Sequence, residues 1–364
     1  MSEVISMDTS EPAEVIVMNE DSDMSDFDLS EDELDGELSL SDLASGSDDD
    51  APTRLPGGWG PAGRQPVANA FLGRQGPSSA CCPTDVESPL DYFLLFFTTE
   101  VIEKLALETN RYAAQSLRTQ PSSPSKMRPW EEVDESDLRK FMGLVMLMGF
   151  TQRNGNMESY WSKDTVLATP IFPQVMSRCR FQQIQRYLHF NNNDDLPANR
   201  EDKLYKIRPV YDLLSERWRS MYDLGEFISI DEGMVKWRGR LSFRVYNKDK
   251  PIKYGIKSYI LADSRSKYCW NIDMYHGVSK TLIETVTGLL TPQCMSRWHT
   301  LYMDNFYNSL AMSEHLLDRQ VHTVGTLARH RGEPREIREP GNGNGNALFM
   351  HLQWGNGNDV FMQV

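Results

Sequence analysis

Two acidic positions in the sequence could supply ligands for a divalent cation. In the stretch "EFISIDEGMVKWRGR" (226–240), Asp231 and Glu232 directly follow an apolar run typical of a buried strand. In "RWHTLYMDNFYNS" (297–309), Asp304 occupies the same kind of position. A carboxylate buried at such a position loses its hydration at a large free-energy cost unless another group compensates the charge. Carboxylate oxygens suit Mg²⁺ or Mn²⁺, and a shared ion would supply that compensation.

Phosphodiester chemistry is one use for such a pair. Two ions roughly 3.5–4 Å apart can activate an attacking water and stabilise a leaving oxygen. The acids must then come from separate strands that converge on a rigid scaffold, which holds for Asp231 and Asp304 if their strands are neighbours. The alternative is that each acid caps a strand or pairs with a nearby cation such as Lys236 or Arg238. The order of acid-bearing strand, hairpin, helix and acid-bearing strand weakens that alternative, because it is the ribonuclease H-like layout of polynucleotidyl transferases.

Eight basic residues lie within the 22 positions 236–257, shortly after the first acid, with only Asp249 opposing them. They are Lys236, Arg238, Arg240, Arg244, Lys248, Lys250, Lys253 and Lys257. Such a density fits contacts with DNA phosphates around an active site. A solvated hairpin face with ordinary lysines has the same composition, so composition alone leaves both interpretations open. Aromatic residues between the basic ones, such as Trp237 and Tyr254, could stack on bases, although strands favour aromatic residues in any case.

The elements that position these residues can be predicted from periodicity. Order should begin near Ser88, and helical spacing continues to about residue 222, with Ser136 as the expected N-cap of one long helix. After Gly225 the pattern changes to the alternation of strands, with a hairpin that turns around 264–267. Helices over "TLIETVTGLL" and "SLAMSEHLLDRQ" then alternate with strands over "HTLYMD" and "HTVGTLA". We therefore predict a mixed α+β or α/β fold in which helices pack on a mixed sheet.

The charge of the chain is distributed unevenly. Residues 1–50 contain 18 Asp and Glu and no Lys or Arg, so the remaining residues carry 38 basic against 34 acidic groups. Such an acidic leader cannot bury enough apolar surface to fold, and its partner, if it has one, is unknown. The Pro-, Gly- and Ser-rich residues 51–87 indicate a linker. The longest apolar block, 141–150, is too short to span a bilayer, so we expect no membrane association.

Several blocks together resemble the piggyBac transposases and their domesticated relatives. "ISIDEGMVKWRGR", "KPIKYGIKSYILADS" and "LYMDNFYNS" are similar to the catalytic blocks of that family. "ESYWS" and "FPQVMSRCRFQQIQRYLHFNNN" are similar to its helical region. The resemblance covers roughly residues 88–364 in the order of the family, and within the family it is greatest to the piggyBac transposable element-derived proteins, with the type 4 group as a candidate. Agreement over several long blocks is more specific than a short motif match.

The resemblance implies a DDD transposase that cleaves and rejoins DNA with Mg²⁺ (or Mn²⁺) held by three aspartates. Asp231 matches the first aspartate and Asp304 the second, so both are the implied catalytic residues and metal ligands. Glu232 and Asn305 match neighbouring positions and are not implied ligands. The third aspartate of the family follows a β-rich insertion in a Gly-x-Val-Asp context, which does not occur here, and the sequence stops inside that insertion. We therefore expect impaired catalysis from this chain alone.

The resemblance also implies four regions and a nuclear DNA-binding protein that forms a homodimer. Residues 1–87 are the disordered leader and linker, 88–225 a helical dimerisation and DNA-binding domain, 226–330 an incomplete RNase H-like catalytic core, and 331–364 the start of the β-rich insertion.

Three hypotheses remain after the sequence analysis. The first is a metal-dependent DNA strand transferase, here truncated. The second is a domesticated DNA- or chromatin-binding protein that has lost the chemistry. The third is an interaction scaffold led by the acidic tail.

Overall fold

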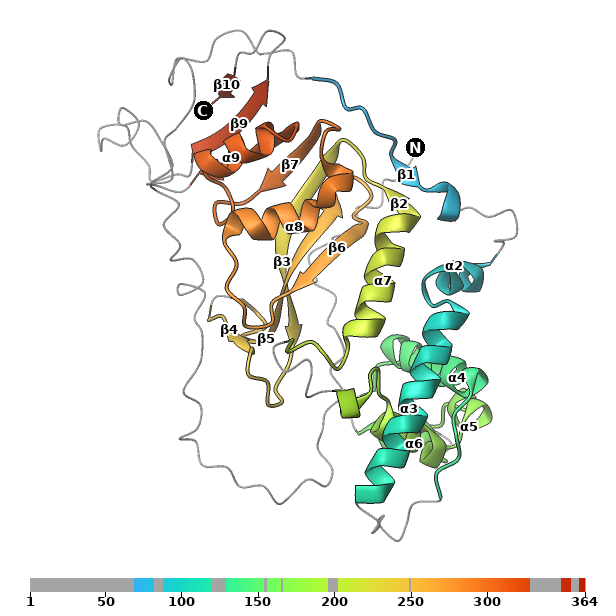
Figure 1. Ribbon diagram of the computed structural model, residues 1–364. Helices are drawn as coiled ribbons and strands as arrows, with labels where there is room; N and C mark the ends of the chain where they lie inside the picture. Colours follow the sequence, from blue (N-terminus) through green and yellow to red (C-terminus); the bar gives the residue numbers. More distant parts are fainter. Residues whose placement is uncertain are drawn as a thin grey trace.

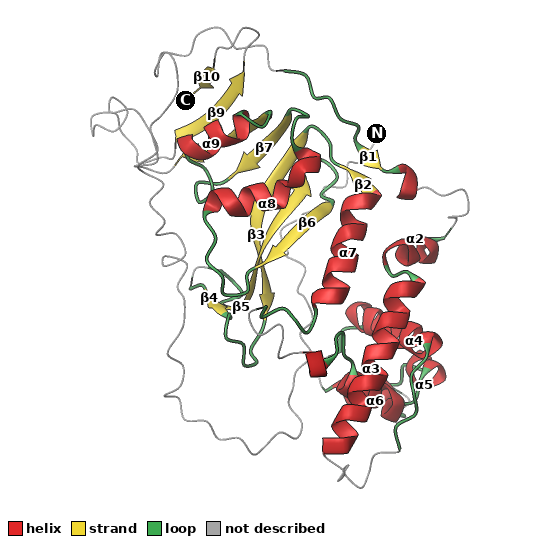
Figure 2. Cartoon of the chain, viewed as in Figure 1, coloured by secondary structure: helices red, strands yellow, loops and turns green. Residues whose placement is uncertain are grey.

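The structure is a computed structural model in which a helical region lies beside a sheet covered by further helices (Figure 1). It describes residues 69–81, 88–119, 129–153, 156–164, 166–195, 202–248, 250–327, 348–354 and 360–363. The predicted acidic leader, residues 1–50, lies outside the described residues. Figure 2 shows helices concentrated in one half of the molecule and strands in the other.

The helical region is built from short and long helical segments, and α2, α4 and α6 each begin with a side-chain N-cap. They are α2 (Pro89–Phe96), α3 (Thr99–Thr119), α4 (Glu135–Phe150), the short 3₁₀ helix η4 (Met157–Trp161), α5 (Ile171–Val175), α6 (Arg178–Tyr187) and α7 (Arg208–Met221). Ser88 caps α2 through a capping box with Asp91. The prediction of Ser136 as the N-cap of α4 was wrong, because Asp134 accepts the capping bond from the amide of Asp137. Aspartate caps as well as serine does, and it lies two residues earlier.

These helices bury a core of their own. Ile102 of α3, Leu138 and Leu144 of α4, and Phe172 and Phe181 from α5 and α6 are at most 2% exposed. Their spacing within each helix is the three-to-four residue period that the sequence shows. Among the described residues, no helix combines the length and apolar character needed to cross a membrane.

The second half of the molecule is an eight-stranded mixed sheet. Its strands are β3 (Phe227–Lys236), β4 (Val245–Tyr246), β5 (Tyr254–Asp263), β6 (Cys269–Met274), β7 (His299–Met303), β8 (Val321–Leu327), β9 (Leu348–Trp354) and β10 (Val360–Gln363). The spatial order is β10-β9-β8-β7-β3-β5-β4, and β6 also pairs with β5. β3, β5 and β6 are antiparallel neighbours, whereas β7 and β8 run parallel to β3. This is the ribonuclease H-like arrangement, and it confirms the predicted mixed fold.

Two helices cross over between the parallel strands and cover one face of the sheet. α8 (Leu282–Cys294) connects β6 to β7, and α9 (Leu310–Leu317) connects β7 to β8; both lie over the strands in Figure 1. Ile228 of β3, Leu261 of β5 and Leu301 of β7 are fully buried in the core beneath them. The sheet is therefore fixed on this side by apolar packing, which makes the strand ends rigid supports for a site.

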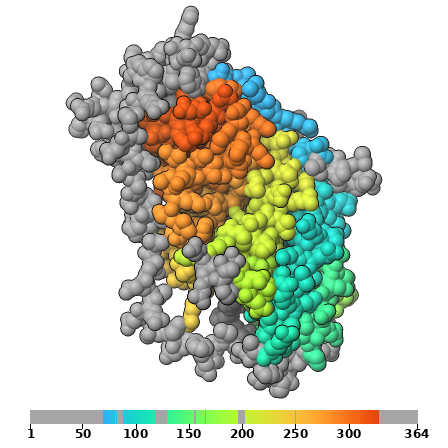
Figure 3. Space-filling view, in the orientation of Figure 1, coloured from blue at the N-terminus to red at the C-terminus, as the bar shows by residue number. Residues whose placement is uncertain are grey.

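Helix α7 joins the helical region to the sheet. The Tyr211 hydroxyl donates to the backbone oxygen of Ile272 in β6. Arg219 donates to the Asn271 side chain at 3.1 Å, and the Tyr268 hydroxyl donates to the Trp218 oxygen at 2.9 Å. The space-filling view shows α7 and the sheet region in continuous contact (Figure 3).

An ordered segment precedes the helical region, although the linker prediction placed the start of order near Ser88. Residues 76–77 form a short strand, β1 (Gly76–Pro77), that pairs with β2 (Tyr222–Asp223). Gln75 donates to the buried carboxylate of Asp263 at 3.3 Å. The prediction failed because Gly- and Pro-rich composition indicates a lack of regular structure, whereas this segment is held by individual hydrogen bonds to the sheet.

Candidate active site

Asp231 lies in β3, and Asp304 directly follows the neighbouring strand β7. β3 and β7 run parallel, and their described pairing ends at Ser229 opposite Tyr302. The same register continued by two residues places Asp231 opposite Asp304. Neighbouring strands lie about 5 Å apart, so the two residues belong to one small area of the sheet.

The two aspartates also share a face of the sheet. Side chains alternate along β3, where Ile228 and Ile230 are buried and Asp231 is exposed. On the face to which Asp231 belongs, the ring of Phe227 lies 6.1 Å from that of Tyr302, which has the same parity as Asp304. The structure therefore brings the two predicted acids together.

The prediction that these acids are buried was wrong. Asp231 and Asp304 are both exposed, because the alternation that turns Ile230 inward turns Asp231 outward. Their hydration is retained, so neither carboxylate needs a cation to be tolerated in the fold. The case for a metal site now depends on their juxtaposition and on the chemistry of their oxygens.

Each carboxylate has one oxygen engaged by a local amide. Asp231 Oδ1 accepts from the amide of Glu232 at 2.7 Å, and Asp304 Oδ1 accepts from the amide of Phe306 at 2.9 Å. Asp304 thus caps the turn after β7, as the alternative interpretation allows. The other part of that alternative fails, since within the described ranges Asp231 forms no ion pair with Lys236 or Arg238.

The opposite face of β3 holds a buried ion pair. Lys257 of β5 is 1% exposed, and its Nζ lies 3.3 Å from Oε1 of Glu232, which is also largely buried. Lys257 was predicted to contact DNA, and this prediction was wrong. It shares the inward parity of Tyr259 and Leu261 on β5, so its ammonium lies inside the protein and does not face a phosphate.

Tyrosines surround this ion pair and respond to its charge. Burial raises the pKa of the Tyr259 phenol to about 12, and the nearby Glu232 carboxylate contributes to that rise. Burial and the same carboxylate raise the pKa of Tyr307, which is fully buried. Burial lowers the pKa of the Lys257 ammonium, and Glu232 opposes that shift. The cluster is therefore a set of partly desolvated groups directly behind the two aspartates.

Seven of the eight predicted basic residues lie at the surface of the segment between β3 and β5. Lys236, Arg238, Arg240, Lys248, Lys250 and Lys253 are exposed, and Arg244 is half-buried. The guanidinium of Arg244 lies over the Tyr254 ring at 5.2 Å and donates to the Arg238 oxygen at 3.4 Å. We call these seven residues the basic hairpin. It begins at Lys236, about 17 Å along β3 from Asp231.

The aromatic residues of the same segment divide between core and surface. Phe243 and Tyr259 are buried, whereas Trp237 is 41% and Tyr254 39% exposed. Tyr246 is half-buried and packs against Tyr254 with their ring centroids 4.7 Å apart. Trp237 and Tyr254 are the two members that a stacking base could reach.

The donor set at Asp231 and Asp304 suits a hard divalent cation. It offers carboxylate oxygens only, which favours Mg²⁺ or Mn²⁺ over zinc. In the described part of the chain, no cluster of three or more His, Cys, Asp or Glu residues could hold a metal. Two protein carboxylates with water completing the shell is a common way to bind Mg²⁺, so the two aspartates fit as a pair of ligands.

The sequence interpretation missed the Glu232–Lys257 pair. Glu232 has the same parity as Ile228 and Ile230, and Lys257 has the same parity as Leu261. Parity along the two strands was therefore the available signal. Charge counting over the segment concealed it.

Comparisons with known proteins agree with this architecture. A family model described as "Transposase IS4" matches residues 88–347. The human PiggyBac transposable element-derived protein 3 is 25% identical over 256 residues, which cover 68% of this chain and 41% of that protein. The human PiggyBac transposable element-derived protein 2 is 24% identical over 268 residues, covering 70% and 42%. The chain thus spans less than half the length of these curated relatives, and assignment to the type 4 group stays a prediction.

A solved structure shares the fold. The chain is similar, with a TM-score of 0.67 and 24% identity, to a piggyBac transposase solved by cryo-EM as a synaptic complex with hairpin DNA. The similarity covers 79% of this chain and 62% of that one. Because the family model covers well over half of the sequence, the chain belongs to the Transposase IS4 family and is of the piggyBac type.

Proposed function

We propose that this chain is a transposase-derived DNA-binding protein in which Asp231 and Asp304 bind a divalent cation beside a DNA phosphate. One observation carries the proposal. The parallel register of β3 and β7 places Asp231 opposite Asp304, and both side chains are exposed. When bound, Mg²⁺ or Mn²⁺ would polarise a phosphodiester and activate an attacking oxygen. The contribution of the chain is to hold two carboxylates at a fixed separation and to place DNA against them.

The basic hairpin supports the DNA part of the proposal. Its exposed ammonium and guanidinium groups can neutralise phosphates and fix the register of a duplex without reading its sequence. The similar piggyBac transposase was solved as a complex with hairpin DNA, which agrees with such a ligand. We extend the proposal to a homodimer formed through residues 88–225, by resemblance to the piggyBac transposases, and to a nuclear location, which a role on chromosomal DNA requires.

Salt titration of the full chain on a labelled DNA hairpin tests the binding function. Fluorescence anisotropy should give an affinity that falls steeply with salt. Charge reversal at Arg240, Lys248 and Lys253 should reduce the magnitude of the slope by about 3, at roughly 0.9 for each phosphate that is no longer neutralised. Lys267→Glu is the matched control, because Lys267 is exposed at the opposite end of β5. Equal effects of the triple variant and the control would contradict the placement of DNA on the hairpin.

Metal binding and cleavage are separate readouts on the same preparations. Electron paramagnetic resonance of Mn²⁺ should show an ion that binds to the wild type and does not bind to Asp231→Asn or Asp304→Asn. A nicking assay with Mg²⁺ then separates an enzyme from a binding protein. Nicking that both variants abolish supports strand cleavage, whereas DNA binding without nicking supports the domesticated protein. A chain with no affinity for DNA would refute both and favour the scaffold hypothesis.

A further inference from the structure

Lys257 is a buried cation of the sheet, and its surroundings form a built site. Only 1% of the residue is exposed. Its Nζ lies 3.3 Å from the Glu232 carboxylate and 4.7 Å from the ring centroids of both Tyr259 and Phe306. An ammonium without water is tolerated only when a paired charge and polarisable ring faces replace its hydration. This fold supplies both.

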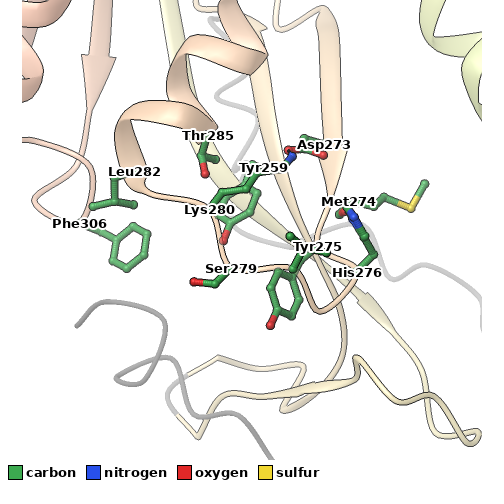
Figure 4. Close-up of a pocket in the computed structure, with 11 residues that line it drawn as sticks. Tyr259, Asp273, Met274, Tyr275, His276, Ser279, Lys280, Leu282, Thr285 and Phe306 are labelled. Atoms are coloured by element: carbon green, nitrogen blue, oxygen red, sulfur yellow. Dashed lines mark hydrogen bonds and ion pairs between the residues drawn. The ribbon is translucent and has the colours of Figure 1, made fainter. Parts of the chain in front are cut away.

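The groups that contact the ammonium are chain neighbours of the two candidate ligands. Glu232 follows Asp231 in β3, and its side chain emerges on the opposite face. Phe306 lies two residues after Asp304, and its amide donates to Asp304 Oδ1 at 2.9 Å. Figure 4 shows Phe306 and Tyr259, which come from different elements, lining one pocket. Two rings from different elements thus meet at one buried ammonium.

The other side of the Asp304 turn has its own anchor. Asn308 is fully buried, and its amide nitrogen donates to the Thr326 oxygen in β8 at 3.0 Å. That bond ties the turn to the strand on one side of β7. On the other side, where β3 carries Asp231, one connection passes through Phe306, Lys257 and Glu232, and Tyr307 of the same turn also interacts with Glu232. Loss of the ammonium would remove the connection through Phe306 and leave Tyr307 as the remaining side-chain contact between the turn and Glu232.

We propose that Lys257 is a positioning residue that fixes the separation of the Asp231 and Asp304 carboxylates, by holding Glu232 of β3 and Phe306 of the Asp304 turn around one buried ammonium. The inference rests on the proposed function, since it assigns Lys257 a role at that metal site. It removes Lys257 from the DNA-binding surface and gives it a different function in the same region.

The test compares Mn²⁺ affinity with DNA affinity in the full chain. Lys257→Met keeps the length of the side chain and removes its charge, and Phe306→Leu removes the ring with a smaller change in the fold. Both should weaken Mn²⁺ binding about tenfold or more, as loss of groups that orient metal ligands does. DNA affinity measured in EDTA should stay unchanged. Lys257→Arg should recover part of the Mn²⁺ affinity, which a loss of packing alone would not predict.

Leu144→Ala is the control for general destabilisation, because Leu144 is buried in the core of the helical region. It should lower the melting temperature and leave Mn²⁺ affinity unchanged. Unchanged Mn²⁺ affinity in folded Lys257→Met would overturn the proposal, and if that variant does not fold, unchanged affinity in Phe306→Leu would do so.

If the wild type binds no Mn²⁺, the proposed metal site fails. Amide hydrogen exchange then tests the positioning role of Lys257 independently of metal binding. The amides of Phe306 and Asn308, which bond to Asp304 Oδ1 and to its backbone oxygen, should exchange faster in Phe306→Leu or Lys257→Met. Unchanged exchange in the folded variants would overturn the positioning role as well.

Discussion

Asp231 and Glu232 are adjacent in the chain and lie in opposite environments. Asp231 is exposed beside Asp304, whereas Glu232 points to the helix-covered face and pairs with the buried Lys257. The exposed carboxylate contributes little to the fold and is free to bind a ligand. The buried one contributes to the fold and is not free to do so. A single strand thus separates a chemical role from a structural role by the alternation of its side chains.

Removing one member of the buried pair should have the largest effect on stability. Lys257→Met leaves the Glu232 carboxylate buried without its counter-charge, and we expect a loss of about 3 kcal/mol in the free energy of unfolding of the sheet region. Urea denaturation followed by circular dichroism measures it. The double variant Lys257→Met, Glu232→Leu removes both charges and should recover most of that loss, because apolar residues can replace a buried ion pair. Equal losses in the single and double variants would mean that the pair is not the cause.

The anchor of the Asp304 turn should come next in magnitude. Asn308→Ala removes the bond to Thr326 and the bond that the buried Asn308 Oδ1 accepts from Ser313, so we expect a loss of about 2 kcal/mol. Asn305→Ala in the same turn is the matched control, because Asn305 is exposed, and it should cost under about 0.5 kcal/mol. Thermal unfolding of the two variants measures this difference in stability. Similar melting temperatures would show that burial of Asn308 does not stabilise the turn.

Much of the fold was predictable because its signals are local. The turn at residues 264–267 lies between β5 and β6 as expected, and alternation correctly identified β3 as a strand. N-caps were harder, since Asp134 and Ser136 are both good caps and lie only two residues apart. The segment 69–81 could not be predicted because its order comes from contacts with residues distant in the chain, such as Asp263.

The sequence predicted which aspartates form the candidate site, but it did not predict that they are exposed. That Asp231 and Asp304 meet depends on the parallel register of β3 and β7, which no local pattern specifies. That they are exposed depends on which face of the sheet the helices cover, which is also a property of the whole fold. Lys257 is different: its parity with Leu261 was visible in the sequence, and attention to parity would have separated it from the exposed lysines.

The difference between buried and exposed lysines can be tested through the salt dependence of DNA binding. Lys253→Ala removes an exposed charge of the basic hairpin and should reduce the salt slope by about 0.9 if the residue contacts a phosphate. Lys257→Met should leave the slope unchanged, because a buried ammonium releases no counterion. Anisotropy titrations in EDTA between low and moderate salt measure both. An equal reduction in slope would place Lys257 at the DNA surface and contradict its burial.

The smallest effect on stability is expected from the two exposed aspartates. The informative result for them is whether DNA affinity rises or falls. Asp231→Asn with Asp304→Asn should change the free energy of unfolding by under about 0.5 kcal/mol, because neither carboxylate is desolvated. In EDTA the same double variant should bind DNA slightly more tightly than the wild type, because two negative charges no longer repel the phosphates. With Mn²⁺ present that advantage should disappear, since only the wild type gains the bridging ion. A double variant that loses DNA affinity in EDTA would show that the carboxylates support the surface structurally, which would remove the distinction between the two faces of β3.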